Sequence, residues 1–228
     1  MFASLLGPEG KRRRMLRKAP DGPVKDYLSA PFPDIKKDIH EVPILSLDFE
    51  TTGLNPEQDR ILSVGYIELQ HSEILLSTAV HKLIRPEQSI SEESVVIHRI
   101  TDDTAAFGKP LDEVIPELLG ALSGKIMLAH HAAIETRFLT NACKRLYGMS
   151  PVFPVIDTLK LARQWYARRG KEHAHGDLRL FNLRERIGLP GYNAHNALSD
   201  AISTAELFLA QVEHMDNNAS PPLRQFLV

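Results

Sequence analysis

Cysteine, long apolar runs and net charge are what the sequence has least of, and each scarcity narrows what the protein can be. Cys143 is the only cysteine among 228 residues, which excludes a disulfide within the chain and favours a reducing compartment, the cytoplasm. No stretch approaches the roughly 18 apolar residues that a membrane helix needs. The apolar pair Leu5–Leu6 is too short for a signal peptide, and the basic residues follow it instead of preceding it. We therefore expect a cytoplasmic protein with no membrane partner.

The net charge is small, but the charged residues are unevenly placed. The 27 Lys and Arg residues and 29 Asp and Glu residues give a formal net charge of −2, which does not by itself indicate a nucleic-acid partner. A basic cluster nevertheless occurs near the start of the chain and comprises Lys11, Arg12, Arg13, Arg14, Arg17 and Lys18. Such a cluster can follow a phosphate backbone or belong to a disordered, solubilising tail, and the sequence leaves both alternatives open. Zinc-finger, RNA-recognition and helix-turn-helix signatures are absent, so base-specific reading of a nucleic acid is not expected.

The sequence divides into three parts. The composition, 43% hydrophobic and 25% charged, is that of a globular domain. Residues 1–40 hold the basic cluster and several prolines that prevent a long helix, so we expect an N-terminal extension there. Regular patterning over 41–213 predicts the folded domain, and 214–228 form a C-terminal tail. The tail ends in "LRQFLV", which resembles short peptides that dock on a sliding clamp, although an apolar patch that packs on its own domain is the simpler explanation.

Within the folded domain, three strands are predicted first, at 43–49, 60–69 and 73–84. The short connections between them favour an antiparallel meander. A fourth strand is predicted at 125–130. Helices are predicted at 110–124, 132–148, 155–170, 178–189 and 196–215. Three antiparallel strands followed by alternating strands and helices predict an α/β fold, with a mixed sheet flanked by helices.

Two of these helices carry specific local signals. Asp157 or Thr158 is the expected N-cap of the helix at 155–170. In the last helix, the apolar stripe that we expect to be buried comprises Leu198, Ile202, Ala205, Phe208 and Leu209.

Two acidic residues end the first predicted strand. Asp48 and Glu50 alternate along it, so both side chains point to one face, and Phe49 points to the opposite face and into the core. Two like charges side by side at the end of an apolar strand are costly. A solvated surface position would explain them, but a divalent cation would remove the repulsion, and Mg²⁺ prefers carboxylate oxygens.

Further candidate ligands follow along the chain. Glu135 lies at the start of a helix just after the fourth strand, and Asp200 lies near the start of the last helix. His195 precedes Asp200 by five residues. Neither acid alone indicates a metal site, because acids are favoured at helix starts. A lone His195 is more often a cap or a surface residue. Their joint order is informative: D-x-E on the first strand, an acid after the next core strand, then H-x₄-D at the last helix.

This order resembles the DEDD-type, DnaQ-like 3′–5′ exonuclease superfamily. It is similar to the DEDDh branch, which includes the proofreading epsilon subunit of bacterial DNA polymerase III. The resemblance covers residues 42–212 and rests on several motifs: "LDFETTGL", "IHRIT", "AHHAAIETRFL", "VIDTLKLAR" and "HNALSDA". The chain departs from the family in one place, since Glu135 stands where the family usually has Asp.

The resemblance implies a ribonuclease H-like fold and two divalent metal ions, Mg²⁺ or Mn²⁺, about 4 Å apart. It implies that Asp48 bridges both metals, that Glu50 and Asp200 complete the first metal site, and that Glu135 serves the second. It also implies that His195 takes a proton from the attacking water, a task suited to an imidazole with a pKa of about 6.5.

The resemblance also places substrate contacts around the acids. The expected substrate-binding residues are Thr51, Thr52, Gly53, Leu54, His98, Ile100 and His130. Leu54 is expected to wedge against the terminal base, and His130 to orient the site. A second possible metal set, His173, His175 and Asp177, is better explained as a polar loop between helices.

The implied function is removal of nucleoside monophosphates from single-stranded 3′ ends, with DNA as the first choice of substrate. An oligoribonuclease that acts on short RNA is an alternative within the same chemistry. A catalytically weak relative that binds nucleic acid or a polymerase is an alternative from another class. A polymerase or a sliding clamp is a possible protein partner.

Overall fold

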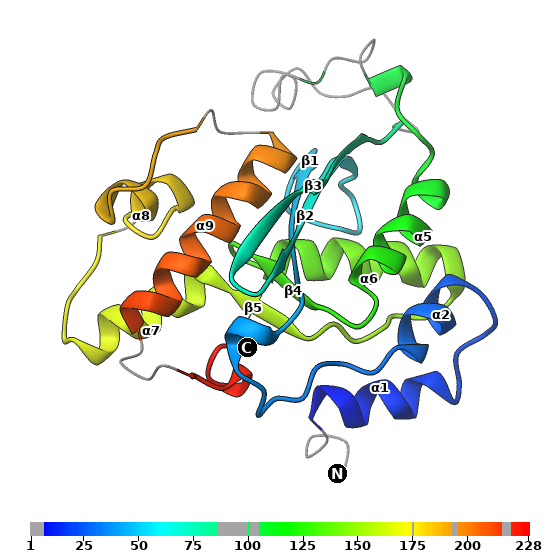
Figure 1. Ribbon diagram of the computed structural model, residues 1–228. Helices are drawn as coiled ribbons and strands as arrows, with labels where there is room; N and C mark the ends of the chain where they lie inside the picture. The colour runs from blue at the N-terminus through cyan, green and yellow to red at the C-terminus, as the bar shows by residue number, and fades with distance from the viewer. Residues whose placement is uncertain (1–6, 86–99, 101–104, 175, 193–195, 216–219) are drawn as a thin grey trace.

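The computed structural model describes the whole chain except residues 1–6, 86–99, 101–104, 175, 193–195 and 216–219 (Figure 1). Within the described part, no helix is long and apolar enough to cross a membrane.

A five-stranded sheet forms the centre, in the order β3-β2-β1-β4-β5. Its strands are β1 (Ile44–Thr51), β2 (Ile61–Gln70), β3 (Glu73–Leu83), β4 (Ile126–Ala129) and β5 (Val155–Asp157). The pairs β1–β2 and β2–β3 are antiparallel, whereas β4 runs parallel to both β1 and β5. The predicted mixed sheet and antiparallel meander are therefore confirmed.

One strand differs from the prediction. Val155–Asp157 was expected to open a helix, but these residues pair with Met127–Ala129 as β5. The β-branched Val155 and Ile156 favour a strand. The helix begins only at Thr158, because the Asp157 carboxylate accepts hydrogen bonds from the amides of Leu159 and Lys160. Asp157 is thus both the last strand residue and the predicted N-cap.

Helices cover both faces of the sheet (Figure 1). On one face lie α5 (Leu111–Leu122) and α6 (Ala133–Tyr147), and on the other lies α9 (Ala197–Met215), with α7 (Thr158–Arg168) and α8 (Leu180–Arg186) packed beside it. Side chains of β1 point alternately to the two faces of the sheet, so the strand contributes to the core on each side. Phe49 packs with the α5–α6 core, as predicted, whereas the Ser46 hydroxyl on the other face donates to the Ala201 carbonyl of α9 at 2.7 Å.

The buried stripe of α9 is made of smaller residues than the sequence predicted. The fully buried apolar positions include Ala197, Ala201, Ala205, Phe208 and Val212. Leu198, Ile202 and Leu209 are only partly buried, so the prediction was wrong for these three residues. Small residues at the start of α9 allow its backbone to lie close to the sheet.

The N-terminal segment packs against the domain. It forms α1 (Pro8–Leu16), α2 (Pro23–Ser29) and a 3₁₀ turn, Ile39–Glu41. Tyr27 is 1% exposed, and its hydroxyl donates to the Val152 carbonyl at 3.1 Å. The disordered-tail alternative is therefore wrong for the described residues, and residues 23–32 share one core with the domain expected at 41–213.

The basic cluster lies on α1 and in the turn just after it, at the end of the molecule away from the first turn of α9 (Figure 1). Arg12 is buried, pairs with Glu9 at 2.7 Å and donates to the Leu28 carbonyl, so it helps to hold α1 against α2. The other five basic residues are exposed: Lys11, Arg13, Arg14, Arg17 and Lys18.

The C-terminal tail also packs on the domain. Leu223 and Phe226 are buried, and the Phe226 ring meets Phe208 of α9 edge-on, with ring centroids 6.0 Å apart. Leu227 forms an isolated bridge to Ile156 of β5, and the Val228 amide donates to the Val155 carbonyl. Leu223 and Phe226 thus pack internally, as expected of an apolar patch on its own domain, whereas Val228 is 50% exposed.

Candidate active site

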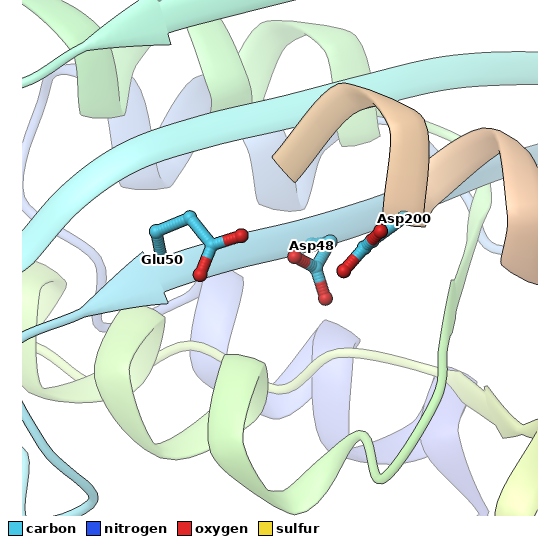
Figure 2. Close-up of side chains that lie close together, drawn as sticks. All are labelled: Asp48, Glu50 and Asp200. Carbon is cyan, nitrogen blue, oxygen red and sulfur yellow. The ribbon is translucent and has the colours of Figure 1, made fainter. Parts of the chain in front are cut away.

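Three of the expected metal ligands converge at one end of the sheet. Asp48 and Glu50 extend from β1, and Asp200 extends from the first turn of α9 toward them (Figure 2). One ligand atom from each residue lies within 4.8 Å of the others. The strand alternation that directs Ser46 to α9 also directs Asp48 and Glu50 there. The bond from Ser46 to Ala201 fixes α9 one residue beyond Asp200.

The electrostatics of this cluster favour a cation. The pKa of Asp48 is raised well above its usual value, first by burial of its carboxyl group and then by the neighbouring charges of Glu135, Glu50 and Asp200. Carboxylates held this close repel one another unless protons or cations balance them. The donor set consists of hard oxygen atoms, which suit a divalent ion such as Mg²⁺ or Mn²⁺.

Glu135 lies next to the three-residue cluster without being part of it. It occupies the first turn of α6 and is only 2% exposed. Its Oε2 atom is buried and has no hydrogen-bond partner among the described residues. Burial raises the pKa of Glu135 to about 8, and the charges of Asp157 and Glu50 add to the effect. A buried carboxylate oxygen without a partner among the described residues fits a metal ligand.

Asp157 has a structural role, through one of its two carboxylate oxygens. Its Oδ1 atom accepts hydrogen bonds from the backbone amides of His131, Leu159 and Lys160, at 3.0–3.3 Å. The carboxylate therefore joins the end of β4 to the start of α7. Because these bonds use Asp157 in the fold, Glu135 remains the candidate for the fourth acid.

The two histidines that follow β4, His130 and His131, contact residues of α7 and β5 next to the site. His130 Nδ1 lies 2.8 Å from the Thr158 hydroxyl, and burial lowers the pKa of His130 to about 4, which keeps the ring neutral near pH 7. His131 has a left-handed backbone with φ of 67°, and it is this backbone turn that aims its amide at Asp157. His131 tolerates this conformation better than most residues would.

Hydrogen bonds from side chains within the turn after β1 stabilise that turn. The Thr51 hydroxyl donates to the Gly53 carbonyl at 2.7 Å, and the Thr52 hydroxyl accepts from the Arg60 amide at 3.0 Å. A Cβ atom at Gly53 would collide with the Asp59 carboxylate. Leu54, four residues after Glu50, is 68% exposed.

The remaining expected site residues fall in three groups. Ile100 is 7% exposed and packs with Leu62 and Ala105, which leaves little of its side chain for a substrate. His195 and His98 lie outside the described residues. Of the second possible metal set, Asp177 pairs with Arg186 at 2.6 Å and accepts from the Ala174 amide, which fits the polar-loop explanation, and His175 is not described.

Sequence reasoning missed a cationic cavity beside Glu135. The cavity has a volume of about 460 Å³, and it reaches from His131 and Ile134 to the helices α7 and α8. Its charged or titratable lining residues are His130, His131, Arg163, His173 and Arg179. Arg163 and Arg179 are ordinary helix-surface residues in the sequence, so only the arrangement of α7 and α8 brings them together.

Comparison with known proteins agrees with this geometry. A family model described as "Exonuclease" matches residues 45–208, a span that contains all four acids. The chain belongs to the exonuclease family. The predicted resemblance to the DnaQ-like, DEDDh exonucleases is thereby confirmed.

Two relatives of this exonuclease-family chain are replication proteins. It is 31% identical over 178 residues to DNA polymerase III subunit epsilon of Treponema pallidum, covering 77% of this chain and 80% of the relative. It is 38% identical over 169 residues to DNA polymerase III PolC-type of Thermotoga petrophila, covering 74% of this chain but only 12% of the relative. The chain therefore matches a small part of the PolC-type polymerase.

The fold of this exonuclease-family chain also matches a solved DEDDh structure. The nuclease domain of 3′hExo, a DEDDh family member bound to rAMP, superposes with a TM-score of 0.65 at 18% identity, covering 78% of this chain and 94% of that domain. The predicted ribonuclease H-like arrangement, a mixed sheet flanked by helices, is confirmed as the fold.

Proposed function

We propose that the protein is a 3′–5′ exonuclease that depends on two divalent metal ions and releases nucleoside monophosphates from single-stranded 3′ ends, with DNA as its main substrate. The convergence of Asp48, Glu50 and Asp200 within 4.8 Å carries this proposal. A protein that only binds a partner has no reason to hold three carboxylates together at this cost.

Each acid has a position that fits its proposed role. Asp48 lies between Glu50 and Asp200 (Figure 2), which suits a carboxylate shared by two ions, and the buried Glu135 offers its oxygen from α6. When bound, the ions would stabilise the attacking and leaving oxygens of the phosphodiester. Leu54 would support the terminal base, and His195 would accept the proton of the attacking water. The role of His195 rests on the family motif.

The cationic cavity supports the binding of a strand. It adjoins Glu135 through His131 and Ile134, and it carries Arg163 of α7 and Arg179, which immediately precedes α8. Guanidinium groups bind phosphate through paired hydrogen bonds. We expect the cavity to hold backbone phosphates on the side of the site away from the terminal nucleotide. None of its lining residues belongs to a base-reading motif, so the expected binding is independent of base sequence.

Two other functions remain as outcomes of the test. An oligoribonuclease would use the same acids on very short RNA, and a weakly active relative would act as a subunit of a polymerase. The names of the relatives support a polymerase as the protein partner. The single cysteine, Cys143, is buried and unpaired, which fits a protein that acts in the reducing cytoplasm.

The test is incubation of pure protein with end-labelled single-stranded DNA, RNA and dinucleotides, with Mg²⁺ or Mn²⁺. We expect stepwise shortening from the 3′ end of DNA, with loss of activity in Asp48→Asn. Glu73→Gln, which changes an exposed acid at the start of β3, is the matched control and should behave as wild type. Preference for RNA dinucleotides would establish the oligoribonuclease alternative. No hydrolysis of any substrate would overturn the proposed activity.

A further inference from the structure

A second basic pocket lies at the same edge of the sheet as the acids. It has a volume of about 420 Å³ and is lined by Arg60, Arg85 and Arg145, together with apolar residues and one acid, Asp112. The three arginines come from three different parts of the fold. In sequence they are separated by many residues, so no basic run marks them.

The backbone fixes two of these arginines. Arg60 leads into β2, and its amide and carbonyl are both bonded to Thr52, at the exit of β1. Arg85 follows β3, and its amide donates to the Lys109 carbonyl at 2.9 Å. Because Thr51 pairs with Ile61 and Leu83 pairs with Ser63, the end of β1, the start of β2 and the end of β3 lie at one edge of the sheet.

The pocket and the acids lie on opposite faces of that edge. Ile61 and Ile84 line the pocket, and both pack in the same core cluster as Phe49. Phe49 points away from Asp48 and Glu50, since adjacent strand residues face opposite sides. Arg145, in the last turn of α6, closes the pocket on the side of the helices. A strand whose 3′ end lies at the acids therefore reaches the pocket only across this edge of the sheet.

The positive charge of the pocket favours the binding of an anion. Three guanidinium groups and one carboxylate line it, so the lining carries a net positive charge of about two. Several cations gathered in one concave site create a positive potential that attracts anions. The planar guanidinium group matches phosphate in particular, because it donates two parallel hydrogen bonds.

We propose that this pocket binds a phosphate group of the nucleic acid outside the metal site. The phosphate belongs either to the backbone of a bound strand or to the released nucleotide. The inference rests on the proposed exonuclease function, because that function supplies both sources.

An exposed aromatic residue beside the pocket favours the strand. Phe107 is 90% exposed, and it precedes Gly108, where a Cβ atom would collide with the backbone of Ile84 and Arg85. Such close backbone approach holds Phe107 near Arg85. Exposed aromatic rings next to cations are typical of single-strand binding, because bases stack on them whatever the sequence.

The experiment measures binding in EDTA, where no hydrolysis occurs and the acids repel phosphate. The variant Arg85→Gln/Arg145→Gln is compared with Lys36→Gln/Lys144→Gln, which removes two exposed cations that do not line the pocket. For a single-stranded 20-mer, loss of two phosphate contacts should flatten the slope of log affinity against log salt by about 1.4, at about 0.7 for each contact. The control pair should keep the wild-type slope.

Parallel titrations with inorganic phosphate and a nucleoside monophosphate separate the two sources. A changed slope for the 20-mer, with about tenfold weaker binding in Phe107→Ala, assigns the phosphate to a strand. An effect on the monophosphate alone assigns it to the released nucleotide. Unchanged binding of all three probes in Arg85→Gln/Arg145→Gln overturns the inference. Wild-type hydrolysis, measured separately with metal, reports on the proposed function whichever result is found.

Discussion

Gly65 lies directly beneath the backbone that joins Ala197 to Leu198 at the start of α9. A Cβ atom on Gly65 would overlap the Ala197 carbonyl group and the Leu198 amide. Gly65 also pairs with Asp48 across β1 and β2. The absence of a side chain at this position therefore lets α9 approach the sheet closely enough for Asp200 to reach Asp48.

We predict that Gly65→Ala destabilises the protein and disrupts the acid cluster. The added methyl group must push α9 away from the sheet, and overpacking of this kind costs about 1–3 kcal/mol. Thermal unfolding should show the loss of stability, and added Mn²⁺ should no longer raise the melting temperature. Gly120→Ala is the control, since no atom lies within 4 Å of a Cβ built there and alanine favours its helix, α5. A normal metal response in Gly65→Ala would show that α9 can accommodate the methyl group.

Metal linkage gives a second prediction. Millimolar Mn²⁺ or Mg²⁺ should raise the melting temperature of the wild type, because the ions bind the folded acids and not the unfolded chain. At about 100 times the dissociation constant, the gain is about 2.7 kcal/mol. Asp48→Asn should cancel it, whereas Glu73→Gln should preserve it. An unchanged wild-type melting temperature at saturating metal would count against a formed carboxylate site.

How much of this could be read from the sequence depends on the range of the interactions. The direction of Asp48, Glu50 and Phe49 follows from strand alternation alone, and it was predicted correctly. The family motifs added Glu135 and Asp200. The role of Gly65 was missed, because a glycine within a strand pattern does not reveal which helix lies above it.

The N-terminal segment shows a second limit. The helices α1 and α2 have nine and seven residues, too few for a clear apolar period, and one of the buried side chains is a charged one, Arg12. The strand β5 has three residues and is followed at once by a helix, so the sequence pattern assigns its apolar residues to that helix. In each case the tertiary contact, and not the local pattern, decides the structure.

A third prediction tests whether the N-terminal segment is part of the core. Tyr27 packs against Phe153 with ring centroids 5.2 Å apart. Tyr27→Ala should destabilise the protein by about 3–5 kcal/mol, as for other large buried aromatic residues. Tyr27→Phe, which loses only the hydrogen bond to Val152, should cost about 0.5–1.5 kcal/mol. Chemical denaturation measures both values, and equal stability of Tyr27→Ala and wild type would make the segment a dispensable extension.

His130 leads to a prediction about pH. Its pKa is about 4 in the folded protein, because burial disfavours the charged ring, against about 6.5 when unfolded. Between these values the unfolded state binds more protons, so the contribution of His130 to stability falls as the pH drops from 6.5 toward 4. The slope reaches up to about 1.4 kcal/mol for each pH unit.

The His130 effect is measured as a difference between variants, because the raised pKa values of the acids act in the opposite direction. Urea unfolding of wild type and His130→Asn at several pH values should show the wild type losing stability relative to the variant as the pH falls. His71→Asn, on the exposed turn between β2 and β3, is the matched control. Parallel pH curves for wild type and His130→Asn would mean that the pKa of His130 is the same in the folded and unfolded states.

Glu135 gives the last prediction, because it is the acid in which this chain departs from its family. A glutamate carries its carboxylate about 1.5 Å further from the backbone than an aspartate does, one carbon–carbon bond. The first turn of α6 holds that carboxylate buried, and its Oε2 atom has no hydrogen-bond partner among the described residues, which leaves this oxygen available to a metal. This longer side chain would hold a bound metal less rigidly, which favours Mn²⁺, because Mn²⁺ tolerates irregular geometry better than Mg²⁺.

Glu135→Ala should therefore abolish most hydrolysis, and Glu135→Asp should stay active while its ratio of Mn²⁺-supported to Mg²⁺-supported activity falls. Glu57→Ala, at an exposed acid in the turn between β1 and β2, is the control and should change neither the rate nor the ratio. Full activity of Glu135→Ala with both metals would remove Glu135 from the site. Asp157 would then be the first place to look for the fourth acid, through its second carboxylate oxygen, because its Oδ1 atom already accepts three backbone amides.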